Sequence, residues 1–94
     1  MGPGNKAALD ERMTEIFPDE IYRSGGIYQE LLREFTELIE DMEEGVPLKL
    51  ISEEESMMHT IFAFIYNAKE ITMIQYAKLH DLMAEIRTSI KERI

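Results

Sequence analysis

The sequence contains no cysteine, which excludes a disulfide framework and any thiolate metal site. That absence fits a reducing compartment, and we expect a cytoplasmic protein. The longest uninterrupted apolar run, residues 61–66, is far shorter than the ~20 residues that a membrane-spanning helix needs. No charged-then-apolar secretory signal pattern opens the chain. We therefore expect no membrane partner.

Proline and glycine are scarce, with three and five residues. Both gather in residues 1–6, which we expect to be a flexible leader. The remaining prolines and glycines divide the rest of the chain into long segments without a helix breaker. These breakers are Pro18, Gly25, Gly26, Gly45 and Pro47. Because 94 residues allow one domain, we expect residues 7–94 to fold as a unit.

Basic residues are few, with 10 Lys and Arg against 19 Asp and Glu, for a net charge of -9. Residues 30–55 alone hold ten acidic residues and two basic ones, which is a balance of -8. Such a density of one sign disfavours bare nucleic acid and anionic membranes as partners, and it favours cationic proteins or metal ions.

The segments between the breakers have the apolar spacing of helices. We predict a short helix over residues 7–17, one further turn over 19–23, and main helices over 27–44, 53–68 and 73–93. Ser52 with Glu55, and Thr72 with Gln75, have the spacing of capping boxes at the starts of the last two helices. The predicted fold class is therefore all-α, a small up-and-down bundle of three main helices plus a short N-terminal helix.

One face of the predicted helix over residues 27–44 is acidic. Its residues repeat at intervals of four and three, and they are Glu30, Glu34, Glu37, Asp41 and Glu44. Their axial spacing, roughly 4.5–6 Å at 1.5 Å per residue, is near the separation of phosphates in nucleic acid. We therefore take these five residues as the predicted partner-binding surface, and mimicry of nucleic-acid charge as its most specific form.

The predicted helix over residues 53–68 is apolar around most of its circumference. One side carries Met57, Ile61, Phe64, Ile65 and Ala68, and the apolar zone extends around the helix through Met58, Phe62 and Tyr66. Either this helix is central and the others surround it, or it has a second apolar face for a partner. Under the second hypothesis Met58, Phe62 and Tyr66 are the predicted self-association or docking residues of a homodimer.

An enzyme is the first alternative. The pairs Glu34-x-x-Glu37, Glu37-x-x-Glu40 and Glu40-x-x-Glu43 resemble half of the metal-binding motif of all-helical nucleoside-triphosphate pyrophosphohydrolases. That resemblance would imply a metal-dependent hydrolase. The second half of the motif, Glu-x-x-Asp, is absent, and the acids lie opposite the apolar stripe. We therefore predict no catalytic residue, no metal ligand and no cofactor.

A DNA-binding regulator is the second alternative. The capped start of the last helix, at Thr72 and Gln75, is similar to the entry of a recognition helix in helix-turn-helix domains. No basic residue lies between Thr72 and Ala77, where a DNA reader would need several, so we predict no direct nucleic-acid binding.

The leading hypothesis is a non-catalytic helical protein that binds, and thereby inhibits, a basic protein partner, and that forms a homodimer. Small acidic helical antitoxins, immunity proteins and phage-encoded inhibitors neutralise basic partners in this way, and the link to this chain is an analogy.

Overall fold

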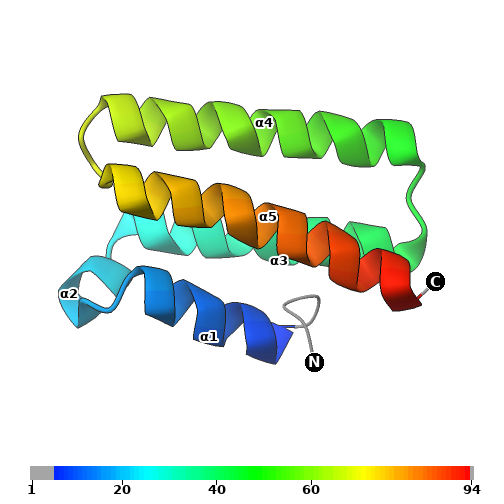
Figure 1. Cartoon of the computed structure of the whole chain (residues 1–94), viewed down its shortest axis with the longest axis horizontal. Coiled ribbons are helices and arrows are strands. Elements are labelled where there is room, and N and C mark those ends of the chain that lie inside the picture. The colour runs from blue at the N-terminus through cyan, green and yellow to red at the C-terminus, as the bar shows by residue number, and fades with distance from the viewer. Residues whose placement is uncertain (1–5, 94) are drawn as a thin grey trace.

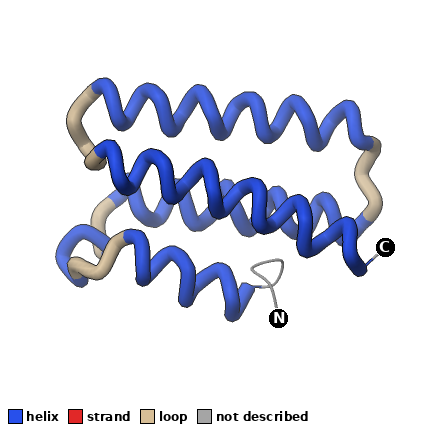
Figure 2. Tube along the Cα trace, in the orientation of Figure 1, coloured by secondary structure: helices blue, strands red, loops and turns tan. Residues whose placement is uncertain are grey.

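Residues 6–93 form helices joined by short loops in the computed structural model, which describes the backbone of these residues and the side chains of residues 7–89 (Figure 1). The helices are α1 (Lys6–Ile16), α2 (Glu20–Arg23), α3 (Gly26–Glu44), α4 (Leu48–Asn67) and α5 (Met73–Arg93). Figure 2 shows no strand in this part of the chain. The predicted fold class, an all-α small helical bundle, is confirmed, and α2 is the additional turn expected at residues 19–23.

The helices pack in an order that leaves α4 at one side of the molecule. In Figure 1, α3 and α5 lie in the middle, α4 lies beyond them on one side, and α1 lies on the other. α4 packs on both α3 and α5, and so does α1. One flank of α4 therefore adjoins α3, another adjoins α5, and its outer side is covered by neither.

The core lies between these helices and is almost entirely apolar. Its central aromatic pair is Phe35 of α3 and Phe62 of α4, whose stacked rings have centroids 5.7 Å apart. α1 supplies Leu9 and Met13 from the other side, and α5 supplies a buried stripe that includes Leu79. The buried residues of α3 and α5 recur at intervals of three and four, so each helix turns one apolar stripe toward the core.

The helix ends follow the predicted stop and start signals in most places. Gly45 ends α3 with a left-handed φ of 80°, a conformation that glycine adopts without a Cβ clash. At the start of α5 the capping box is present: the Gln75 backbone N–H donates to the Thr72 hydroxyl at 3.1 Å, and the Thr72 N–H donates to the Gln75 side chain at 2.9 Å.

One predicted boundary is wrong by more than one residue. α4 begins at Leu48 rather than at residue 53, so Ser52 lies inside the helix and forms no capping box with Glu55. The carbonyl of Pro47 accepts the first bonds, from the N–H groups of Leu50 and Ile51, and burial of the Ile51 side chain stabilises this added turn. At the N-terminus Lys6 already belongs to α1, and the rest of the predicted leader, residues 1–5, lies outside the described residues.

Candidate functional site

The acidic face of α3 adjoins α4 along one edge. Its exposed members are Glu30, Glu37 and Glu44. Glu34 and Asp41 are half-buried, and their charges act on the carboxyl group of Glu54 in α4. The five predicted residues therefore lie on one side of α3, but the prediction that they oppose the core is wrong for Glu34 and Asp41.

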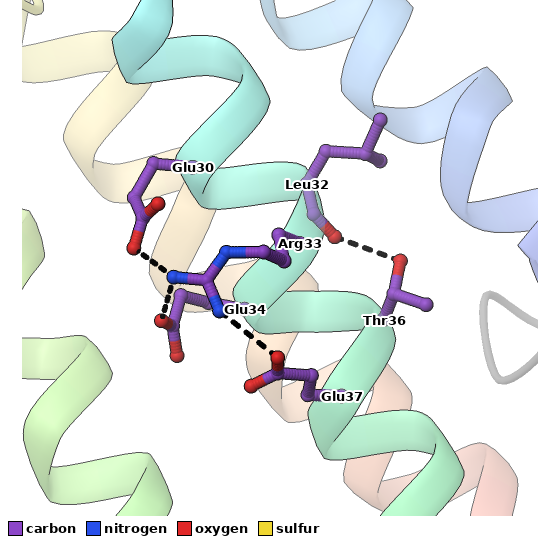
Figure 3. Close-up of polar contacts among 6 residues, drawn as sticks. All are labelled: Glu30, Leu32, Arg33, Glu34, Thr36 and Glu37. Carbon is purple, nitrogen blue, oxygen red and sulfur yellow. Dashed lines mark hydrogen bonds and ion pairs between the residues drawn. The ribbon is translucent and has the colours of Figure 1, made fainter.

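A single arginine, Arg33, interrupts the negative row (Figure 3). Its guanidinium forms ion pairs with the carboxylates of Glu30, of Glu34 at 3.1 Å and of Glu37 at 2.9 Å. The hydrogen bond that the Arg33 guanidinium donates to the Glu30 carboxylate is the largest of several effects that raise the pKa of Arg33. The first half of the row is therefore partly neutralised within its own helix, and the phosphate-like array predicted from spacing is not uniform in sign.

Glu54 of α4 lies beside the second half of the row. Burial raises the pKa of Glu54 to about 7, and a hydrogen bond with Asp41 acts in the same direction. The charges of Glu37 and Glu34 raise it further, because each adds to the negative potential at this carboxyl. Near neutral pH, part of the Glu54 population therefore carries a proton, at the boundary between α3 and α4.

An exposed apolar row runs along α4 next to these acids. Leu50, Met57 and Phe64 are seven residues apart, so they lie above one another on the helix, and they are 48%, 62% and 73% exposed. Ile61 is half-buried and lies between Met57 and Phe64, four and three residues away, on the flank toward α3. The apolar row of α4, meaning these four residues, therefore borders the acidic face of α3.

A groove of about 170 Å³ opens between the two helices near the start of α3. Its lining is apolar apart from Glu30, and consists of Gly26, Ile27, Glu30, Leu31, Ile61 and Ile65. Because Ile61 belongs both to this lining and to the apolar row, groove and row form one continuous apolar surface with carboxylates at its edge.

The residues predicted for self-association lie elsewhere. Met58 is 1% exposed and Phe62 is 0% exposed, so neither can contact a partner while the chain is folded. Tyr66 is half-buried, and its ring stacks on Tyr76 of α5 at 4.8 Å. The prediction that Met58 and Phe62 form the surplus face is wrong, because α3 and α5 cover that side of α4 and leave the side with Met57 and Phe64 uncovered.

A second cluster of chemistry-bearing groups lies between α4 and α5. The rings of His59 and His80 stack with centroids 4.5 Å apart, and Nε2 of His80 is buried without a hydrogen-bond partner. Burial lowers the pKa of His80, and the nearby His59 contributes to the same shift. Glu55, 5% exposed, forms an ion pair with Arg87 of α5. These contacts join the two helices within the chain.

Neither alternative function has a matching arrangement in the described part of the chain. Among those residues, no three acidic or histidine side chains are placed so that they could hold a metal ion. α4 and α5 run antiparallel side by side (Figure 1), whereas the helices of a helix-turn-helix cross at about 90–120°. The described helices also include none with the length and apolar content needed to cross a membrane.

No known protein family matches the chain, and comparisons with curated proteins and with solved structures likewise give no match. The candidate site is therefore defined by its own geometry: the acidic face of α3, the apolar row of α4 and the groove between them.

The apolar row carried a signal in the sequence that the prediction did not use. The seven-residue spacing of Leu50, Met57 and Phe64 can be read directly from the chain. Nothing local could identify the position of Glu54, because its pKa depends on Asp41 of another helix.

Proposed function

We propose that this chain is a non-catalytic protein-interaction module that binds a basic protein partner through the acidic face of α3. The observation that carries the proposal is the exposure of Glu30, Glu37 and Glu44 at seven-residue intervals along one side of α3. Carboxylates so placed attract a cationic surface and orient it during encounter. A partner whose basic surface is covered in this way is inhibited wherever that surface is needed for its activity.

Mimicry of nucleic acid is not needed for this function. Phosphates along a strand all have the same sign, whereas Arg33 pairs with three carboxylates of the acidic face. What supports the broader proposal is the remaining negative charge and its position beside an apolar surface. A homodimer through Met58 and Phe62 is not part of the proposal, because both side chains belong to the core.

The test is affinity capture with a charge-neutralised variant. The triple variant Glu30→Gln, Glu37→Gln and Glu44→Gln keeps side-chain size and helix propensity while removing three charges. The matched control removes three exposed acids from α1 and α2 through Asp10→Asn, Glu11→Gln and Glu20→Gln. Each protein is immobilised at low salt and exposed to a lysate of the organism that encodes the chain, and bound proteins are identified by mass spectrometry.

The proposal predicts a basic protein bound by the wild type and by the control, and released by salt. For that partner in purified form, we expect the α3 variant to weaken binding at least about threefold, since three rim charges contribute roughly 0.2–1 kcal/mol each. Loss of Glu30 and Glu37 also leaves Arg33 without two of its ion pairs, which adds repulsion toward a cationic partner. Equal binding by both triple variants would reject the proposal.

A further inference from the structure

The surface between α3 and α4 combines three features that are typical of a binding surface. Met57 and Phe64 are large apolar side chains held mostly in water, at 62% and 73% exposure. The groove beside them continues the apolar surface inward to Leu31 and Ile65, which are buried. Carboxylates of α3, beginning with Glu30 at the groove itself, follow the apolar surface along its length. Exposed apolar surface with a polar border is typical of a protein contact site.

The size of the groove indicates what it can receive. Small-molecule sites usually measure about 300–1,000 Å³ and enclose most of the ligand. A volume of about 170 Å³ instead suits a single apolar side chain, inserted as an anchor from a larger partner. The apolar row then provides further contacts at Phe64, Met57 and Leu50, spaced along a straight line as the residues of a second helix would meet them.

We propose that the surface formed by the groove, the apolar row of α4 and the acidic face of α3 binds an amphipathic helix of a partner protein, with lysine or arginine along one border of its apolar stripe. This inference rests on the proposed function and specifies the chemistry of the partner. The apolar stripe packs on Met57, Ile61 and Phe64, and the cationic border faces the carboxylates of α3. A helix-in-groove contact of this kind uses anchors at three-, four- and seven-residue intervals.

A second copy of this chain fits the same surface poorly, for reasons of charge and symmetry. In a two-fold contact the same patch faces itself. An arrangement that places α4 on α4 also places the acidic face of α3 on its own copy. The arrangement that places α4 on α3 covers the apolar row with carboxylates. Both juxtapositions are unfavourable, whereas a cationic helix satisfies the apolar and the charged part together.

Glu54 makes the proposed contact sensitive to pH. The groups that face it from α3 are Asp41, Glu37 and Glu34, all acidic, and Arg33 pairs with the last two. A cation placed here stabilises the ionised form of Glu54, so binding lowers the pKa of Glu54 from about 7 and releases a proton. Affinity for a cationic helix therefore rises as the pH increases through 7.

The experiment uses two synthetic peptides of identical composition, built from leucine, lysine and alanine with blocked ends. One places leucine on one helical face with lysine at its border, and the other has the order scrambled so that no apolar stripe remains. Binding to the full chain is followed by fluorescence anisotropy at constant ionic strength. Neither peptide contains a group that titrates between pH 6 and 8, so any pH dependence in that range comes from the protein.

Surface variants assign the contact to the proposed residues. The double variant Met57→Gln and Phe64→Gln removes the two most exposed side chains of the apolar row. The matched control, Ile21→Gln and Ile74→Gln, removes side chains that are 83% and 68% exposed on α2 and at the start of α5. We expect the first double variant to weaken binding of the amphipathic peptide at least tenfold, and the control to change it less than twofold. Glu54→Gln is expected to abolish the severalfold rise in affinity between pH 6 and 8.

The outcomes separate this inference from the proposed function. If the scrambled peptide binds as tightly as the amphipathic one, the acidic face attracts cations without an apolar site, and the inference fails while the proposed function stands. If neither peptide binds the wild type at low salt, the inference is rejected, and the lysate capture still decides the proposed function. Self-association of the wild type in sedimentation equilibrium, lost in the Met57 and Phe64 variant, would show that a second copy occupies the surface and would overturn the inference.

Discussion

Replacing Glu54 by glutamine should stabilise the protein at pH 8 and leave its stability nearly unchanged near pH 4. Glutamine keeps the shape of the protonated carboxyl and can still donate a hydrogen bond to Asp41. The change removes the negative charge that Glu54 otherwise acquires above pH 7, beside Asp41, Glu37 and Glu34. The variant therefore isolates the cost of placing one more charge at the boundary between α3 and α4.

The sign follows from the direction of the pKa shift. The pKa of Glu54 is raised from 4.5 to about 7 on folding, so the folded state binds the proton more tightly than the unfolded state. This contribution is fully present below about pH 4.5 and is lost as the pH rises through 7. The shift corresponds to at most about 3 kcal/mol, and solvent screening of a partly exposed carboxyl reduces the expected effect to about 1–2 kcal/mol.

Urea unfolding of the wild type and of Glu54→Gln between pH 4 and 8 measures this difference directly. His80 contributes to the pH dependence with the opposite sign: burial lowers its pKa, so stability is lost as the pH falls below the pKa that His80 has in the unfolded chain. Because both proteins contain His80, the difference between their free energies of unfolding isolates the contribution of Glu54. The control is Glu53→Gln, which removes a charge from the exposed neighbouring position. A Glu54→Gln protein no more stable than the wild type at pH 8, or a difference that does not grow with pH, would refute the reasoning.

Three further predictions concern the core, a buried ion pair and a helix cap. Phe62→Ala should lower the free energy of unfolding by about 3–5 kcal/mol, because it leaves a cavity in the core, and Phe62→Leu should lower it by roughly a third of that amount. Phe62→Asp should prevent folding, because it places a charge in the core. Urea unfolding and circular dichroism distinguish these cases. Arg87→Ala should destabilise by about 1–3 kcal/mol by leaving the Glu55 carboxylate buried without its partner, and adding Glu55→Gln should restore part of the loss in a double-mutant cycle. Thr72→Ala should lower the free energy of unfolding by about 1 kcal/mol. An unchanged melting temperature would show that the capping box with Gln75 does not stabilise the protein.

The acidic face of α3 illustrates what a residue pattern can and cannot predict about a binding site. The side of α3 that carries the five acids could be predicted, because residues three and four apart in a helix always lie on one side. The contacts that these acidic side chains make could not be predicted from the pattern. Arg33 pairs with three carboxylates through geometry that depends on side-chain conformation, and Asp41 meets a residue of the next helix. Net charge from composition therefore overstates the uniformity of the face.

The second half of the candidate site was predicted on the wrong side of α4. The residues at 57, 61 and 64 and those at 58, 62 and 66 are both apolar, so hydrophobic periodicity does not decide which set faces inward. Packing decides it, since α3 contributes Phe35 to one side of Phe62 and α5 contributes His80 at 5.5 Å to another. The remaining flank stays exposed because no further helix among the described residues covers it.

The sequence by itself determined the all-α class, the approximate lengths of the main helices and the sign of the surface. Each of these depends on residues within a few positions of one another: periodicity, caps such as Thr72 with Gln75, breakers such as Gly45, and a dense run of acids. Only the tertiary structure decided the rotation of α4 about its own axis. That rotation depends on contacts between residues far apart in the chain, such as Glu55 with Arg87, 32 positions away. It buried Phe62, exposed Phe64 and brought Glu54 against Asp41, and so created the surface to which the proposed function is assigned.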